Sequence, residues 1–430
     1  MSATAARAER GSATPRSDDG RKWPCVPIGS VLAEIQSGFA SGERDEGGVI
    51  QLRMNNVDTR GRIAWDRFLR VPATSKMIDE YCLVPGDVVF NNTNSTELVG
   101  KSALFDGHAE PVVFSNHFTR LRVRPDALSA PYLAAWLNHE WQRGTFAEIC
   151  NRWIGQSAVK PDKLLALEIP LPPLAEQERI ARKLTAAMEA VERARWAAQE
   201  RLAAAEALPA AYLREVFEGP RTQEWETRRI DEVCDLLPSK SIATDGDTEV
   251  QAITTACLTE RGFRPGGIKT ARMRGSDVAA CTVRRGEVLI ARSNTPDLVG
   301  RASMFPGEPA GVVASDLTIR VWPRENHGGV EPDFLATYMS FLFQTGYWRE
   351  RAGGASGSMK KITREQLSAG IVPVPPIADQ RRIAAELSHR LAEADRLIAR
   401  LRDELALIDA LPAALLRRAF GGDGAAAGGD

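Results

Sequence analysis

One stretch of sequence occurs twice in this chain of 430 residues, at 172–219 and again at 375–422. The first copy begins PPLAEQERIARKL and the second begins PPIADQRRIAAEL. The offset is 203 residues at the first proline (375 − 172) and again at Phe217 and Phe420 near the end (420 − 217). An offset that stays constant over this length indicates that no insertion is tolerated. This is expected if each copy is one helix that must keep one face toward a partner.

Both copies have the periodicity of a long amphipathic helix. In the second copy the apolar residues recur at alternating steps of three and four, as in a coiled coil, and the first copy has a smaller seam that is richer in alanine. An ordinary helix packed on its own domain is the alternative, but the duplication favours a mutual pair. Each helix is expected to run about 30 residues, from its Pro-Pro start to a Leu-Pro break, and to span roughly 45 Å. The residues predicted to form this helix-pair or partner-subunit interface are Ile180, Leu184, Val191, Leu202, Ile383, Leu387, Leu391, Ile398 and Leu405.

The duplication extends beyond the helices. PGDVVFNNTNSTELVGKSALFDG (85–107) matches RGEVLIARSNTPDLVGRASMFPG (285–307) at an offset of 200 residues. We therefore predict a tandem repeat in which each globular domain is followed by a helical spacer. The predicted domains are 21–171 and 220–374, the spacers are 172–219 and 375–420, and the tails 1–20 and 421–430 are predicted to be disordered.

Each globular domain is predicted to have a mixed α/β or α+β fold. The apolar runs 88–90 and 288–290 follow a Gly-acid turn and are typical of buried strands. Aromatic residues at helical spacing predict one helix at 132–148 and its counterpart at 334–350. The segments 51–72 and 251–274 diverge almost entirely between the halves. This pattern indicates one copied scaffold that carries a variable region.

Composition and motifs argue against an active site in this chain. The net charge is −1, so any surface for nucleic acid must be local. The six cysteines form no CxxC pair, no metal site is predicted, and no apolar run is long enough to span a bilayer, which is consistent with a cytoplasmic protein. The run Gly100-Lys101-Ser102 resembles the end of a P-loop, but Ser95 stands where that motif requires glycine. We therefore predict no catalytic residues, no metal ligands and no cofactor in this chain.

The candidate recognition residues are small polar and basic side chains at matching places in the two halves. Arginine and asparagine can each make paired hydrogen bonds to guanine and adenine edges, so different residues at matching positions would read different bases. The candidates are Arg60, Arg62, Asn92, Thr93, Asn94, Lys101, Gln156 and Lys160 in the first half. In the second half they are Arg272, Arg274, Arg292, Ser293, Asn294, Arg301, Lys360 and Lys361. For any single arginine among them, the alternative is that it is an ordinary solvated surface residue.

These stretches resemble a known family. PLPPLAEQERIARKL and PVPPIADQRRIAAEL are similar to the conserved helices of type I restriction–modification specificity subunits. GDVVFNNTNSTELVGKSALF and GEVLIARSNTPDLVGRASMF resemble the strand-loop segments of their target recognition domains, as does the segment 155–177. The resemblance covers nearly the whole chain except the two tails.

The resemblance implies a non-catalytic DNA-recognition subunit, active in phage defence. Two target recognition domains would each read one half of a bipartite, asymmetric site on double-stranded DNA. An antiparallel pair of long helices would set the gap between the halves. Two modification (methyltransferase) subunits that bind S-adenosylmethionine, and restriction subunits that use ATP and Mg²⁺, would carry out the reactions. The alternatives are a fused methyltransferase, which lacks its motifs here, and a coiled-coil scaffold without sequence-specific DNA binding.

Overall fold

The computed structural model describes residues 23–242, 246–324, 329–356 and 359–421. The predicted tails, apart from Gly421, lie outside these residues. The contacts divide the chain into two units. Unit 1 comprises the chain up to Ala197 together with the part from Leu405 onward, and unit 2 comprises the part from Ala198 to Glu404.

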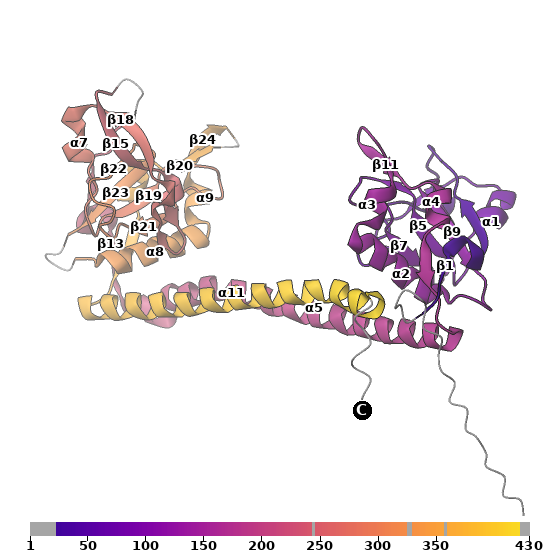
Figure 1. Cartoon of the computed structure of the whole chain (residues 1–430). Coiled ribbons are helices and arrows are strands. Elements are labelled where there is room, and N and C mark those ends of the chain that lie inside the picture. The colour runs from indigo at the N-terminus through magenta and orange to yellow at the C-terminus, as the bar shows by residue number, and fades with distance from the viewer. Residues whose placement is uncertain (1–22, 243–245, 325–328, 357–358, 422–430) are drawn as a thin grey trace, which may run out of the picture. The chain divides into compact units, whose positions relative to one another are not determined.

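The globular part of unit 1 is a mixed α/β domain (Figure 1). Its strands are β1 (Cys25–Pro27), β2 (Leu32–Ser37), β3 (Val49–Leu52), β4 (Leu69–Val71), β5 (Val88–Asn91), β6 (Thr93–Asn94), β7 (Ser102–Leu104), β8 (Val112–Phe114), β9 (Phe118–Val123), β10 (Asn151–Trp153), β11 (Gln156–Ala158) and β12 (Glu168–Pro170). Its helices are η1 (Ile28–Val31), α1 (Ser75–Tyr81), α2 (Ala130–Arg143), α3 (Thr145–Ile149) and α4 (Pro161–Leu165).

The core of unit 1 lies on both faces of an antiparallel sheet of order β2-β9-β5-β7. Because side chains alternate along a strand, Val88 and Phe90 of β5 pack on α2, whereas Val89 faces the other way. On that second side Val89 meets a sheet of order β4-β3-β8, in which β3 and β8 are parallel. The buried strand predicted at 88–90 is thus confirmed, and it lies between the two parts of the core.

Unit 2 repeats this domain. Its strands are β13 (Glu226–Arg229), β14 (Cys234–Leu237), β15 (Thr248–Ile253), β16 (Leu258–Thr259), β17 (Gly262–Phe263), β18 (Lys269–Met273), β19 (Val288–Ala291), β20 (Ser293–Asn294), β21 (Ala302–Met304), β22 (Val313–Ala314), β23 (Thr318–Pro323), β24 (Gly353–Ser356), β25 (Met359–Lys361) and β26 (Ile371–Val374). Its helices are η2 (Pro220–Glu224), α6 (Ile230–Val233), η3 (Thr255–Cys257), η4 (Pro265–Gly267), α7 (Gly275–Cys281), α8 (Pro332–Gln344), α9 (Tyr347–Arg351) and α10 (Arg364–Ser368). The sheet orders β14-β23-β19-β21 and β18-β15-β22 match those of unit 1, which confirms the duplication.

The single helix predicted after the central strands is wrong in both halves. Each is two helices, α2 with α3 and α8 with α9, separated near Gly144 and Gly346. Both glycines have positive φ (85° and 77°), a conformation that ends a helix and that side-chain-bearing residues rarely adopt. The break turns Phe146 and Trp348 inward, where both are buried.

The two long helices are α5 (Leu174–Phe217) and α11 (Ile377–Phe420), each of 44 residues. The predicted Leu-Pro break is wrong, because both helices continue through Pro209 and Pro412. Proline removes one backbone hydrogen bond, but around Pro209 the flanking Ala205 and Leu213 are buried and hold the helix in place. At 1.5 Å per residue each helix is roughly 66 Å long.

The long helices pack together and run antiparallel. In unit 2, ion pairs join Arg201 to Glu404 (2.9 Å) and Glu215 to Arg390 (2.7 Å). Residue numbers therefore increase along α5 as they decrease along α11. In unit 1, Arg195 pairs with Asp409 at 2.8 Å. Among the predicted interface residues, Leu184, Val191, Ile383, Leu387 and Ile398 are buried, and Ile180, Leu202, Leu391 and Leu405 are half-buried.

A buried glutamine joins the start of each long helix to the adjacent domain. The Gln177 side chain accepts a hydrogen bond from Ser129 N (2.9 Å) and donates to Ala127 O (3.1 Å) and Pro172 O (2.8 Å). The Gln380 side chain accepts from Glu331 N (2.8 Å) and donates to Gly329 O (3.1 Å) and Pro375 O (2.8 Å). These bonds explain the glutamine in the repeated PPLAEQ and PPIADQ sequences.

Candidate nucleic-acid interface

A small sheet brings together two separate candidate segments of unit 1. Strand β6 pairs with β11, so that Asn94 lies opposite Ser157 and Thr93 opposite Ala158. Strand β11 continues as a hairpin with β10, and Trp153 lies opposite Gln156 across the turn. Residues more than 60 positions apart in sequence therefore form one surface.

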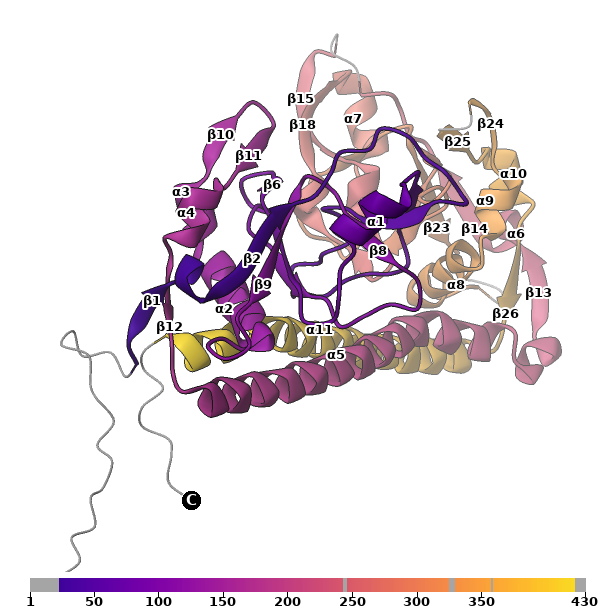
Figure 2. The ribbon, with the colours of Figure 1, turned by 90° about the vertical axis from the view of Figure 1, so that its right-hand side faces the viewer.

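Unit 2 has the same arrangement. Strand β20 pairs with β25, placing Ser293 opposite Lys361 and Asn294 opposite Lys360, and β25 pairs with β24. In both views of the molecule, each hairpin lies on the side of its unit away from the long helices (Figures 1 and 2). We call each of these three-stranded sheets, with its hairpin, the reading sheet of its unit.

In unit 1, part of the predicted set is engaged in internal hydrogen bonds. The Asn92 amide donates to Asn116 O (3.2 Å) and to Thr119 Oγ1 (2.9 Å), and the Asn94 amide donates to Asn91 Oδ1 (2.6 Å). Both side chains therefore shape the loop from within. Gln156 and Lys160 are exposed on the hairpin and directly after it, where they are open to a ligand.

In unit 2, the reading sheet concentrates positive charge. Lys361 is exposed, Lys360 is half-buried beside Asn294, and Arg292 donates one hydrogen bond, at 3.4 Å, to Asp316 O. Burial, and then the neighbouring charge of Arg292, lowers the pKa of Arg364, which donates to the carbonyls of Leu236 and Leu237. Clustered cations of this kind are stabilised when an anion such as phosphate binds beside them.

Lys101 is buried and Arg301 is half-buried, and both lie next to the variable segments. Lys101 is buried, and its ammonium donates to Met54 O (3.4 Å) and Val57 O (2.5 Å). Burial lowers the pKa of Lys101, and the charge of Asp58 opposes this shift. Arg301 lies 3.6 Å from Glu260 and over the ring of Phe343. The glycines before these two residues have positive φ and pack on Phe146 and Trp348, so this segment is a packed turn rather than a phosphate loop.

The remaining candidates lie elsewhere in their units. Arg60 and Arg62 form ion pairs with the long helices, at Glu192 and Asp409. Arg272 on β18 donates to Gly246 O (2.7 Å), and Arg274 is exposed just before α7. The structure thus joins Thr93, Asn94, Gln156 and Lys160 in one unit, and Arg292, Ser293, Asn294, Lys360 and Lys361 in the other.

Two residues that the sequence reasoning missed form the tip of the unit 1 hairpin. Trp153 is 60% exposed and Ile154 is fully exposed, and the turn is completed by Gly155 with φ 76°. Adjacent exposed apolar side chains can mark a surface that contacts a partner. The sequence signal was an aromatic–aliphatic pair before glycine in the otherwise polar run NRWIGQS.

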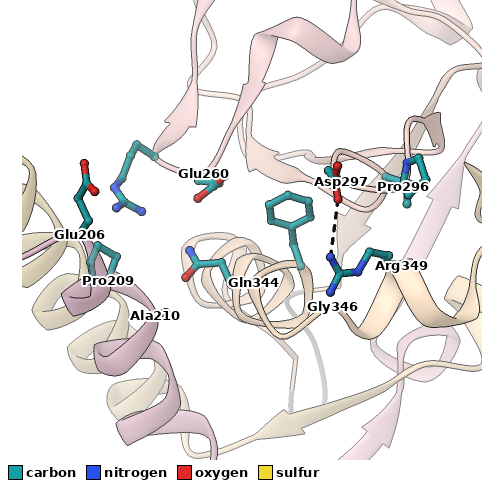
Figure 3. Close-up of a pocket in the computed structure, with 12 residues that line it drawn as sticks. Glu206, Pro209, Ala210, Glu260, Pro296, Asp297, Gln344, Gly346 and Arg349 are labelled. Carbon is teal, nitrogen blue, oxygen red and sulfur yellow. Dashed lines mark ion pairs between the residues drawn. The ribbon is translucent and has the colours of Figure 1, made fainter. Parts of the chain in front are cut away.

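The cleft beside α5 in unit 2 does not have the chemistry of an active site. A cleft of about 350 Å³ in unit 2 is lined by Glu206, Pro209 and Ala210 of α5 and by charged residues of the domain (Figure 3). Its two facing side chains, Asp297 and Arg349, form an ion pair at 3.6 Å. Within the described ranges, no cluster of three His, Cys, Asp or Glu side chains could hold a metal ion, and no helix is long and apolar enough to cross a membrane.

Comparison with known proteins defines the class. The family model for the type I restriction modification DNA specificity domain matches residues 71–197. The MjaX specificity subunit of Methanocaldococcus jannaschii is 36% identical over 108 residues, which cover 25% of each chain. The type I restriction enzyme StySPI specificity subunit of Salmonella potsdam is 23% identical over 254 residues, or 59% of this chain and 52% of that protein. The alignments thus span about a quarter and a half of these curated relatives.

Solved structures show the same fold. A chain from a study of complex assembly and conformational transition in the type I R-M system matches with a TM-score of 0.67 and 22% identity, over 93% of this chain and 97% of that one. The HsdS subunit from Thermoanaerobacter tengcongensis matches with a TM-score of 0.59, the same identity and the same coverage. Two α/β domains joined by paired long helices therefore define the specificity-subunit fold.

The family model and the solved structures agree. Residues 71–197 carry a type I restriction modification DNA specificity domain, and the chain has the fold of the specificity (HsdS) subunits of type I restriction–modification systems. Subunits of this family are the non-catalytic, DNA-recognition components of their complexes.

Proposed function

We propose that this chain directs a type I restriction–modification complex to a bipartite, asymmetric site on double-stranded DNA. The observation that carries the proposal is the duplicated reading sheet with different side chains in its two copies. Asn94 of β6 is matched by Asn294 of β20, but Ser157 and Ala158 of β11 occupy the positions that Lys360 and Lys361 of β25 occupy in unit 2. Because base edges are told apart by the donors and acceptors that meet them, two unlike surfaces would select two unlike half-sites.

The long helices would act as the ruler between the half-sites. Each is roughly 66 Å long, whereas half-sites one helical turn apart are separated by about 34–36 Å. Rods of this length are therefore sufficient to hold two domains on one face of the duplex. The domain boundaries that we propose, 21–171 and 220–374, follow from the same repeat.

The reactions would belong to partner subunits. Two modification subunits binding S-adenosylmethionine would methylate the site, and restriction subunits using ATP and Mg²⁺ would translocate and cleave the DNA, all within the cytoplasm. The near-neutral net charge of −1 supports a division of labour in which partners supply much of the phosphate contact.

The test is selection from a random DNA pool by this chain together with its modification subunit. The expected product is one enriched motif in two parts with a fixed gap. A pool without any enriched motif would favour the alternative, a coiled-coil scaffold that does not read DNA. Exchanging residues 51–72 for the corresponding segment of another specificity subunit should change only one part of the motif.

A further inference from the structure

In unit 1, an arginine from the variable segment contacts both long helices. The guanidinium of Arg60 lies 2.5 Å from Glu192 of α5 and 2.8 Å from Asp409 of α11. Arg62 adds a second contact with Glu192, at 2.6 Å, and also pairs with Asp58. The side chain of Arg60 is only 19% exposed, so these contacts are partly shielded from solvent.

In unit 2, Arg261 makes the corresponding contact. Its Nε lies 2.8 Å and 3.0 Å from the two carboxylate oxygens of Asp395 on α11. Asp395 is the repeat equivalent of Glu192, since 395 − 192 = 203, the offset of the long helices. Both arginines precede a glycine with positive φ, Gly61 at 75° and Gly262 at 104°. The Arg-Gly turn and its carboxylate were therefore kept while the sequence around the turn diverged.

This contact is the third of three attachments that the structure repeats in each unit. The first is the buried glutamine at the start of the helix that follows the domain, Gln177 or Gln380. The second is the last aromatic residue of the other long helix: Phe420 packs on Tyr132 and His139 in unit 1, and Phe217 packs on Phe334, Tyr338 and Phe341 in unit 2. Two attachments still allow a domain to rotate about the line that joins them, whereas a third attachment off that line fixes the angle.

The position of the third attachment is the same in both units. Glu192 lies 15 residues beyond Gln177, and Asp395 lies 15 residues beyond Gln380. This separation corresponds to roughly 22 Å along a helix. We propose that Arg60 and Arg261, here called the anchoring arginines, are positioning residues that fix the angle of each recognition domain on its long helices. They would thereby set which gap between half-sites the complex accepts.

The variable segment has two roles, base reading and attachment to the helix, which tolerate different amounts of sequence change. The variable segment can change its base-reading side chains without penalty to the scaffold, but its Arg-Gly turn must still reach the helix carboxylate. A partly exposed ion pair adds little to folding stability. The contact is therefore expected to influence orientation rather than whether the domain folds.

The two anchoring arginines are not equally restrained. Glu206 is the repeat equivalent of Asp409, since 409 − 206 = 203, but it pairs with Arg402 at 2.6 Å. Arg261 lines the same cleft as Glu206, which is labelled in Figure 3, and within the described residues Arg261 Nη1 has no hydrogen-bond partner. Arg60 thus contacts two helices and Arg261 one, so the angle of unit 2 is expected to be held less tightly.

The inference rests on the proposed function, but its first test does not require DNA. In the full chain with Cys25, Cys82 and Cys150 replaced by serine, spin labels would be placed at Lys269→Cys on β18 and Arg400→Cys on α11, both exposed and both in unit 2. Pulsed electron–electron double resonance would then give the distribution of distances between the domain and the helix. Arg261→Glu should broaden it, and adding Asp395→Arg should restore the original width. Arg264→Glu, an exposed arginine of the same segment, is the matched control.

A second measurement links the angle to specificity. With the modification subunit present, Arg261→Glu should keep the selected half-site sequences. The binding ratio between the preferred gap and a gap one base pair longer or shorter should fall toward one. An unchanged distance distribution in Arg261→Glu, or equal broadening in Arg264→Glu, would overturn the positioning role. If the unmodified chain selects no split site, the proposed function fails, while the distance measurement still decides the role of Arg261.

Discussion

The ring of Phe420, the last residue of α11, lies 5.5 Å from the ring of His139 on α2. His139 is 2% exposed, and both of its ring nitrogens lack hydrogen-bond partners within the described residues. Burial lowers the pKa of His139 from its ordinary value of 6.5; Glu140 opposes the shift, and Arg143 and Arg417 add to it. In unit 2 the equivalent contact is between Phe217 and Phe341, two apolar rings.

Acid should therefore weaken unit 1 selectively. Because the folded pKa of His139 is depressed, the unfolded chain binds more protons once the pH falls below about 6.5. The stabilisation that depends on neutral His139 is therefore fully present above about pH 6.5, and it is lost as the pH falls through the pKa of His139 in the folded chain. His139→Phe, which copies unit 2, should flatten the change in urea midpoint between pH 7.5 and pH 5.5. The exposed His389→Asn serves as control, and an equal flattening there would contradict the assignment.

The buried glutamines should be costly to remove. In Gln380→Ala, the amide of Glu331 and the carbonyls of Gly329 and Pro375 lose their partner. Leaving buried polar groups unpaired costs about 1–3 kcal/mol, so the free energy of unfolding should fall by that order. The exposed Gln199→Ala on α5 should leave it nearly unchanged. Equal effects of the two variants in chemical denaturation would show that the joint contributes nothing specific.

Gly300 should not tolerate a side chain. Its φ is 84°, and an added Cβ would lie 2.5 Å from the Trp348 side chain. Gly300→Ala therefore combines backbone strain with overpacking, each of which costs on the order of 1–3 kcal/mol. Gly266→Ala, at an open position of the same unit, is the matched control. A thermal unfolding midpoint of Gly300→Ala equal to that of Gly266→Ala would refute this explanation of the repeated Val-Gly.

Local patterns in the sequence were sufficient to predict the scaffold. The duplication, the strand at 88–90 and its copy, and the pairing of the long helices all follow from apolar spacing that packing then enforces. Continuity through Pro209 could not be predicted in this way, since proline normally ends a helix, whereas here the burial of Ala205 and Leu213 on either side favours the continuous helix. Tertiary contacts override local preference at such positions.

The candidate site was harder to predict because side chains choose partners far away in sequence. The sequence predicts Asn92 as a recognition residue, but in the structure its amide donates a hydrogen bond to Thr119, 27 positions later. The sequence predicts Arg60 as a DNA contact, but in the structure its guanidinium donates a hydrogen bond to Glu192, 132 positions later. By contrast, Gln156 and Lys361 remain exposed on hairpins whose pairing with β6 and β20 no local pattern indicated.

Lys360 and Lys361 should contribute phosphate contacts. Each phosphate neutralised releases counterions, so the affinity of a complex falls with salt at a slope of about 0.9 per contact. Replacing both lysines by alanine should reduce the magnitude of that slope by about 2 without changing the selected sequence. The exposed Arg400→Ala on α11 should leave the slope as it was. A changed motif at an unaltered slope would mean that the lysines read bases instead.

The apolar hairpin tip should contact DNA in one half-site only. Trp153 and Ile154 are exposed at the hairpin of the unit 1 reading sheet, with Arg152 directly before them and Lys160 after the hairpin. An aromatic ring at such a tip can stack on a base or enter a groove step, and removal of such stacking costs about 1–3 kcal/mol. Trp153→Ala should therefore weaken binding by that amount, and 2-aminopurine placed in the half-site of unit 1 should lose its fluorescence change. Trp196→Ala, which removes an equally exposed tryptophan from α5 (67% exposed), is the control. If Trp196→Ala weakened binding and Trp153→Ala did not, the tip would have no role in the DNA contact.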